Sequence, residues 1–244
     1  MIITYQRIKR FYRKLFLHPI RVFCVHHVSP EYNPRTMWKR DWIETEMFKS
    51  AIDNLQKEYR FISLPEAYHR ICHDFFRFRK LAVLTADDGY QSLLSILPWL
   101  ISHQIPLTLF LNGLYLDGES CSPHILELSK ENKTENEIEL AKELYMTIKD
   151  VEQLNSPLIT VSSHGYEHLD ATRVSETEFI SQITKNIEIL KGFSSFIPFH
   201  AYTWGRHNEK TDAILHKLKI IPVLMDGQKN YNDSSAIHRE EFPG

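Results

Sequence analysis

Short apolar runs alternate with longer stretches of helical spacing along most of this chain. The runs predicted as strands are residues 21–25, 60–63, 81–85, 107–111, 158–162, 196–200 and 220–225. The stretches with helical spacing are residues 44–58, 64–76, 90–103, 135–154, 175–190 and 208–218. Strands that alternate with helices pair in parallel through right-handed crossovers. The pattern therefore predicts an α/β fold, either a barrel or an open doubly wound sheet.

Size and composition are those of an ordinary globular protein. The 244 residues suffice for one large domain, and no linker or internal repeat divides them. The formal net charge of -2 gives no reason to expect a nucleic-acid partner. Cys24, Cys72 and Cys121 are widely spaced and form no CxxC pair, so they indicate neither a zinc knuckle nor a disulfide framework. A reducing compartment is the simpler expectation.

The first residues, "MIITYQRIKRFYRKLFLHPIRVFCV", are basic and aromatic. Five cations interrupt the apolar stretch that a signal peptide requires. We expect residues 1–20 to form a basic amphipathic segment and residues 21–244 to form the barrel domain. Residues 1–18 either contact an anionic membrane surface or pack on the domain as a helix. With no export signal, the expected location is the cytoplasm or the inner face of the membrane.

Two adjacent carboxylates, Asp87 and Asp88, follow a predicted strand in "LAVLTADDGYQSLL". Asp and Gly are common turn formers, so an ordinary solvated turn is one interpretation. Chemistry is the other, because active sites of barrels lie at the carboxyl ends of the strands.

Two histidines follow another predicted strand, in "LITVSSHGYEHLDAT". His164 and His168 are four residues apart, with Gly165 between them. Two imidazoles and a carboxylate from a neighbouring strand end form a common metal-binding set. Chance is the alternative, because the chain contains 13 histidines.

Both motifs resemble those of a known enzyme family. "LTADDGY" is similar to the T-F-D-D-G motif, and "SHGYEH" to the H-S/T-x-x-H motif, of the NodB-homology polysaccharide deacetylases, carbohydrate esterase family four. "RVFCVHHVSP", "IPLTLFLNG" and "FHAYTWGRHN" resemble further segments of the capsule-type and PgaB-like members, and "IHRE" resembles their closing strand, which ends in Arg. The resemblance covers residues 21–240 and implies a distorted (β/α)7 barrel.

The resemblance also implies roles for individual residues. Asp87 would be the general base, and Asp88, His164 and His168 would hold one divalent metal ion, with zinc expected. The backbone N–H of Trp204 would stabilise the oxyanion. The implied reaction removes an N-acetyl group from an amino sugar in a polysaccharide, glycolipid or sugar precursor, in the biosynthesis of cell-surface polysaccharides.

Several positions depart from the family pattern. The replacements are Ala86, Gly165, Thr203 and Trp204, and the L-x-H motif with the usual acid histidine has no clean counterpart. His238 lies near the place of that acid, although a surface position is equally consistent with the sequence. His26 falls where the family has a first-strand histidine, and we expect it at the rim of the site, with a buried core histidine as the alternative.

These departures leave a second function open. A catalytically degenerate member would bind glycan or a partner protein without turnover. An esterase for O-acetyl groups would share the same machinery. The sequence names neither the sugar nor the oligomeric state.

Overall fold

The computed structural model describes residues 17–35, 37–74, 76–123, 125–126, 137–232 and 235–243. The predicted basic segment lies almost entirely outside the described residues, so its two interpretations stay predictions. Within the described part of the chain, no helix combines the length and apolar character needed to cross a bilayer.

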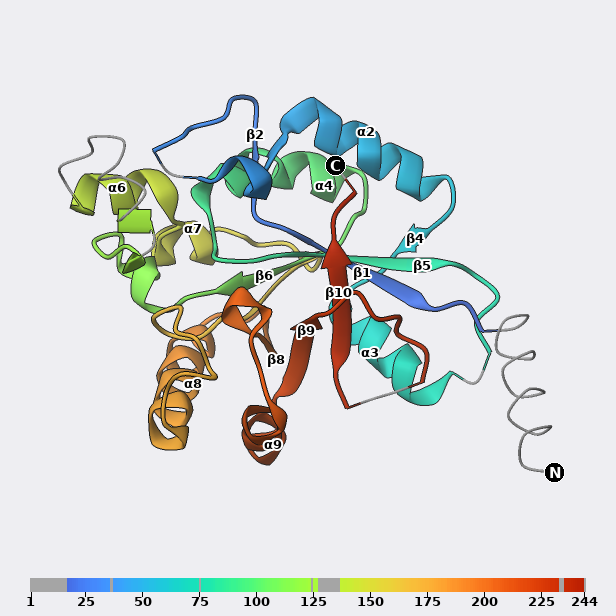
Figure 1. Cartoon of the computed structure of the whole chain (residues 1–244). Coiled ribbons are helices and arrows are strands. Elements are labelled where there is room, and N and C mark those ends of the chain that lie inside the picture. The colour runs from blue at the N-terminus through green and yellow to red at the C-terminus, as the bar shows by residue number, and fades with distance from the viewer. Residues whose placement is uncertain are drawn as a thin grey trace.

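Seven parallel strands close into a barrel, with helices around it (Figure 1). The barrel strands are β1 (Ile20–Val25), β5 (Leu81–Ala86), β6 (Leu107–Leu111), β7 (Ile159–Ser163), β8 (Phe196–Ala201), β9 (Ile221–Met225) and β10 (Ile237–Glu241). The ring closes because β1 pairs with β5 on one side and with β10 on the other. The predicted (β/α)7 barrel is confirmed.

One of the seven predicted strands does not belong to the ring. Residues 60–63 form only the short strand β4 (Arg60–Phe61), which pairs beside the start of β5. Instead, β10 completes the ring. The pattern of apolar runs does not predict this strand, although the family resemblance of "IHRE" does. Two further short strands, β2 (His27–Ser29) and β3 (Trp42–Glu44), form a separate parallel pair.

The described helices follow the predicted order with two differences. They are α2 (Thr45–Gln56), α3 (Leu64–His73), α4 (Leu97–Ser102), α6 (Glu137–Leu144), α7 (Ile148–Glu152), α8 (Glu176–Leu190) and α9 (Glu209–Lys217). The stretch 135–154 divides into α6 and α7, because Thr147 caps α7 by accepting from the Asp150 N–H. The stretch 90–103 begins as a 3-10 helix, Gln91–Ser95, before α4.

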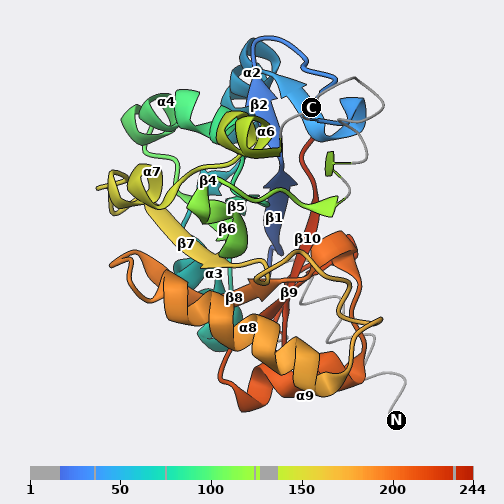
Figure 2. The same ribbon diagram turned by 90° about the vertical axis from the view of Figure 1, so that its left-hand side faces the viewer.

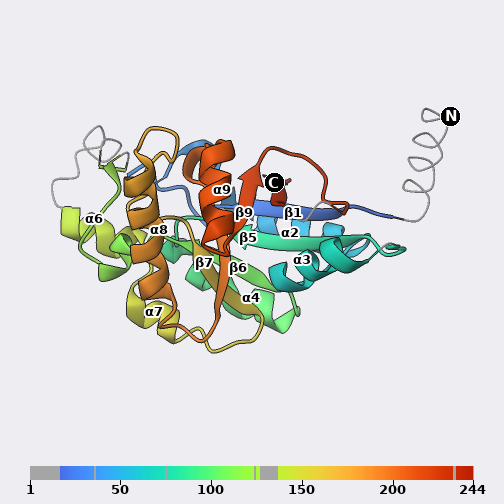
Figure 3. The ribbon, with the colours of Figure 1, turned by 90° about the horizontal axis from the view of Figure 1, so that it is seen from below.

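Strand alternation divides the core into two layers. Val22 and Val83 belong to one cluster, which unites residues of six barrel strands. Their neighbours Phe23 and Leu84 belong to another cluster, which includes Phe48 of α2. Successive side chains of a strand point to opposite faces, so the cluster of Val22 and Val83 fills the barrel and extends onto α3, and the cluster of Phe23 and Leu84 joins the barrel to α2 and α4. On the outside, α8 and α9 pack side by side (Figure 2 and Figure 3).

Candidate active site

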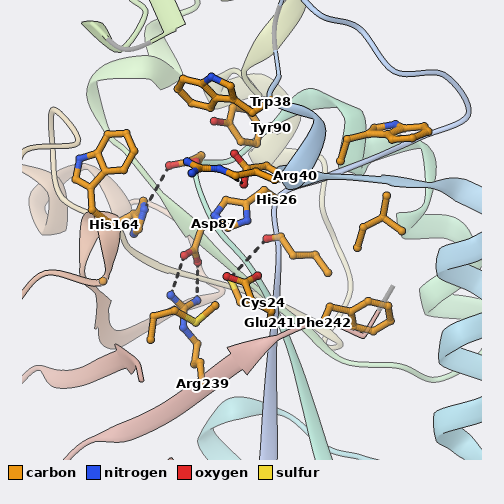
Figure 4. Close-up of a pocket in the computed structure, with 18 of the residues that line it drawn as sticks. Cys24, His26, Trp38, Arg40, Asp87, Tyr90, His164, Arg239, Glu241 and Phe242 are labelled. Carbon is orange, nitrogen blue, oxygen red and sulfur yellow. Dashed lines mark hydrogen bonds and ion pairs between the residues drawn. The ribbon is translucent and has the colours of Figure 1, made fainter. Parts of the chain in front are cut away.

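A pocket of about 870 Å³ opens where the strands end. It is lined by residues that follow β1, β5, β7 and β8, and by residues of β10. Figure 4 shows Asp87 facing Arg239, with Cys24 and His26 nearby. The carboxyl ends of parallel strands meet at one edge of a barrel, which is why segments distant in sequence share this pocket.

Asp88, His164 and His168 form a buried cluster in the pocket. One ligand atom of each lies within 4.8 Å of the others. Asp88 Oδ1 is 3.3 Å from His164 Nε2 and 3.1 Å from His168 Nε2. The structure thus brings together the three residues for which the sequence predicted a shared ion.

The backbone holds His164 in a defined orientation. Its Nδ1 lies 2.9 Å from the Ala201 carbonyl oxygen, so Nδ1 must carry the proton and donate it. The Asn112 amide donates to the carbonyls of His164 and Gly165, at 2.9 and 3.0 Å. A histidine fixed through one ring nitrogen presents the other as a ligand, which is the usual arrangement at metal sites.

The donor atoms of this cluster fit a cation. A neutral His164 directs the lone pair of Nε2 at Asp88 Oδ1, and that buried oxygen accepts no hydrogen bond. Two lone pairs at this distance repel unless a cation lies between them or the ring is protonated. Two nitrogens and one carboxylate oxygen suit a divalent ion that keeps open positions for other ligands.

In the metal-free protein, charges compensate within the cluster. Burial opposes ionisation of Asp88, but His168 and His164 outweigh it and hold the pKa of Asp88 well below its ordinary value. Burial also disfavours the charged form of His164, but Asp87 and Asp88 outweigh it and raise the pKa of His164.

Three site residues have left-handed backbone. Asp88, His168 and Trp204 have φ values of 66°, 57° and 58°. Such a conformation costs a non-glycine residue roughly 1–3 kcal/mol. It turns the chain sharply after β5, β7 and β8, where side chains are directed into the pocket.

Arg239 binds the other carboxylate, Asp87, in a bidentate ion pair. Its Nη1 and Nη2 donate to the two carboxylate oxygens at 2.6 and 2.7 Å, and both side chains are buried. Burial opposes ionisation of Asp87, but the Arg239 guanidinium and then His164 outweigh it and lower the pKa of Asp87 to about 2. Asp87 is therefore ionised and fixed in direction.

His26 lines the pocket and is only partly buried, which agrees with the expected position at the site and not with the alternative of a buried core histidine. β1 and β5 are in register, with Val25 opposite Ala86, and the Asp87 N–H donates to the Val25 carbonyl at 3.1 Å. His26 directly follows β1 and Asp87 directly follows β5, so the two residues lie side by side at the ends of these strands. A ring nitrogen of His26 lies within 4.8 Å of a carboxylate oxygen of Asp87.

Aromatic and cationic side chains line the outer part of the pocket. Trp204 is 44% exposed, and its ring centroid lies 5.0 Å from that of His168 in an edge-on arrangement. Trp38, Arg40 and Trp42 line the pocket from the segment before α2. The Trp42 indole N–H donates to Ser29 Oγ at 2.9 Å, and Lys39 Nζ lies 3.9 Å from its ring centroid.

The structure does not bring His238 to the site. Its Nδ1 lies 2.9 Å from a carboxylate oxygen of Asp226, and it is absent from the described lining of the pocket. The cause is strand alternation: Arg239 points to Asp87, so its neighbour in β10 points to the opposite face. The prediction of His238 as acid is thus not supported.

Sequence reasoning underestimated two residues. The resemblance places Arg239 only at the end of a closing strand, and the sequence does not show that its side chain is buried against Asp87. Asn112, directly after β6, was not selected at all. Its signal would have been its position, because functional residues of a barrel lie at the carboxyl ends of the strands.

Comparisons with known proteins agree with this architecture. A model of the polysaccharide deacetylase family matches residues 78–223, which is more than half of the chain. No curated protein sequence matches the chain significantly.

Solved structures share the fold. IcaB from Ammonifex degensii is 21% identical, with a TM-score of 0.71 over 92% of this chain and 91% of that one. The Streptococcus pyogenes deacetylase PplD in complex with acetate is 17% identical, with a TM-score of 0.66 over 93% and 94% of the two chains. A de-N-acetylase from Aggregatibacter actinomycetemcomitans is 14% identical, with a TM-score of 0.68 over 92% and 96%. At these identities the likeness shows the fold alone.

Proposed function

We propose that this chain, which belongs to the polysaccharide deacetylase family, hydrolyses an N-acetyl group on an amino sugar of a polysaccharide, glycolipid or sugar precursor. One observation carries the proposal. A single pocket holds a buried Asp-His-His cluster directly beside a second carboxylate that is kept ionised. The names of two of the structures with the same fold, a deacetylase and a de-N-acetylase, describe the same class of reaction.

Asp88, His164 and His168 are the residues that would hold a divalent cation, and zinc is our proposal for its identity. A cation bound there supplies Lewis acidity, which polarises the acetamide carbonyl and acidifies the attacking water. The chain contributes the orientation of the ligands, through the contacts of His164 with Ala201 and Asn112.

Asp87 accepts the proton of the attacking water. Its carboxylate lines the pocket next to the cluster, and Arg239 fixes its direction by two hydrogen bonds. Its low pKa keeps Asp87 ionised, so that the carboxylate can accept a proton. The water oxygen then bonds to the acetamide carbon, and the backbone N–H of Trp204 is our proposal for the contact to the oxyanion.

His26 supplies the proton that the amine requires to leave. It is a histidine of the described pocket that the barrel register places beside Asp87, and His238 points elsewhere. When the C–N bond breaks, His26 donates to the nitrogen, and acetate and a free amino sugar result. The three tryptophans of the outer pocket, Trp38, Trp42 and Trp204, offer apolar faces for the sugar ring.

Acetate release together with metal content tests the proposal. Purified protein should bind one equivalent of divalent metal and release acetate from at least one N-acetylated substrate among sugar nucleotides, lipid-linked sugars and chitooligosaccharides. H164A and H168A should lose both the metal and the activity, while H238A should retain them because its side chain points away.

Two outcomes would contradict the proposal. Metal binding without acetate release from any of these substrates would favour the degenerate, glycan-binding alternative. Unchanged metal content in both H164A and H168A would remove the cluster as a metal site.

A further inference from the structure

A second group of ligand atoms lies beside the Asp-His-His cluster. Cys24 Sγ, a ring nitrogen of His26 and a carboxylate oxygen of Asp87 all lie within 4.8 Å of one another. All three residues line the pocket (Figure 4). This group differs from the first one because it contains a thiol.

Backbone pairing fixes the position of this group. Cys24 and His26 are two residues apart along β1 and its continuation, so their side chains share one face. Cys24 pairs with Thr85 of β5, which places Asp87 beside His26. The Asp87 N–H bond to the Val25 carbonyl keeps this register up to the end of the strand. The juxtaposition is therefore a property of the barrel.

One sulfur, one nitrogen and one oxygen form a ligand set that suits zinc and softer divalent ions. Burial raises the pKa of the Cys24 thiol, so the thiol keeps its proton until a cation displaces it. The carboxylate of Asp87 has lone pairs beyond the two that Arg239 occupies, so a cation and the guanidinium can share it.

We infer that Cys24, His26 and Asp87 form a second, inhibitory site for a zinc-like divalent cation. The inference rests on the proposed function, in which Asp87 is the base and His26 the acid. A cation at this site occupies the lone pairs of both groups, so neither can exchange a proton with the substrate. Binding releases the thiol proton to solvent, and removal of the cation restores the site.

The second site should be weaker than the first. The positive charge of Arg239 contacts Asp87, and a cation held by Asp88, the next residue along the chain, would lie near it as well. Both repel an additional dication. The inhibitory site therefore fills only when zinc is in excess over the first site.

Activity as a function of zinc concentration tests the inhibition. Wild-type activity should rise to one equivalent of Zn²⁺ and then fall in excess, on the order of 10²-fold or more, as for loss of a general base. C24A should retain the rise and lose the fall, and C24S provides a second variant of nearly unchanged volume. C72S is the matched control, because Cys72 is an exposed cysteine outside the described pocket lining, and it should behave as wild type. Equal inhibition of C24A and wild type would overturn the inference.

Cadmium binding tests the site without any assay of activity. Titration of metal-free protein with Cd²⁺ should produce an ultraviolet thiolate-to-metal charge-transfer band in wild type, C72S and H164A, but not in folded C24A or C24S. No band in folded wild-type protein would refute the second site, whether or not the protein is an active deacetylase. A Cys24-dependent band in a protein that releases no acetate would instead refute the proposed function and leave the site in place.

Discussion

The two ends of the barrel use similar residues in different ways. At the carboxyl ends of the strands, the ion pair of Arg239 with Asp87 has side-chain exposures of 1% and 5%. At the opposite end, the pair of Lys80 with Glu58, at 2.8 Å, has exposures of 45% and 60%. Water solvates the exposed charges whether or not they meet, so only the buried pair depends on its partner.

Left-handed residues show the same contrast. Gln104 and Lys219 each follow a helix, α4 and α9, and lie before the strands β6 and β9. There the N–H of Ile105 bonds to the Leu100 carbonyl, and the N–H of Ile220 to the Leu215 carbonyl, which is the usual way to end a helix. Asp88, His168 and Trp204 lie in the segments that follow strands instead, and they line the pocket. Left-handed residues therefore terminate helices at the amino ends of the barrel strands, and they position functional groups at the carboxyl ends.

The largest effect is expected from D87N, which removes the carboxylate of the buried ion pair. Asn keeps the shape of Asp87 but cannot accept the proton of water, so turnover should fall by roughly 10²–10⁴-fold. The metal should remain bound, because its ligands are unchanged. Steady-state acetate release and elemental analysis of the folded variant provide the measurement. Loss of the ion in D87N and its retention in D88N would show that the roles of the two carboxylates are reversed.

The next effect concerns the free energy of unfolding. R239M leaves the buried carboxylate of Asp87 without its partner, and such a loss costs about 3–5 kcal/mol. K80M at the exposed end should cost about 0–1 kcal/mol. Urea unfolding of the two variants and wild type, all in chelator, measures both values. Similar losses in R239M and K80M would remove the distinction between the two ends.

The smallest effect is a pH dependence of the stability of the metal-free protein. Asp87 has a pKa of about 2 in the folded chain, compared with an ordinary value of 3.8, so its ionisation favours the folded state. This contribution, about 2 kcal/mol, is fully present above pH 3.8 and is lost as the pH falls through 2. Unfolding in chelator from pH 5 to pH 2 should show a steeper loss for wild type than for R239M. Parallel curves would contradict the assignment to this ion pair.

Much of the fold could be predicted because it depends on local patterns. The apolar runs gave the barrel strands except β10, whose sequence "IHREE" carries charges on three of five positions. Charged residues can occupy this strand because they are paired: Arg239 with Asp87, and Glu240 with Arg21. A strand stabilised by ion pairs with distant residues has no apolar signal of its own. For the same reason, the apolar pattern did not indicate that β10 closes the ring.

The sequence alone determined which residues stand at the strand ends. Asp87, Asp88, His164 and His168 follow apolar strands, and the chain order of a (β/α)7 barrel is enough to bring such positions to one edge. Tertiary structure decided how they are partnered. The pairing of Asp87 with Arg239, 152 residues away, and the position of His26 beside it depend on ring closure and strand register. The opposite direction of His238 depends on the same register, because a shift of one residue along β10 would exchange the faces of His238 and Arg239.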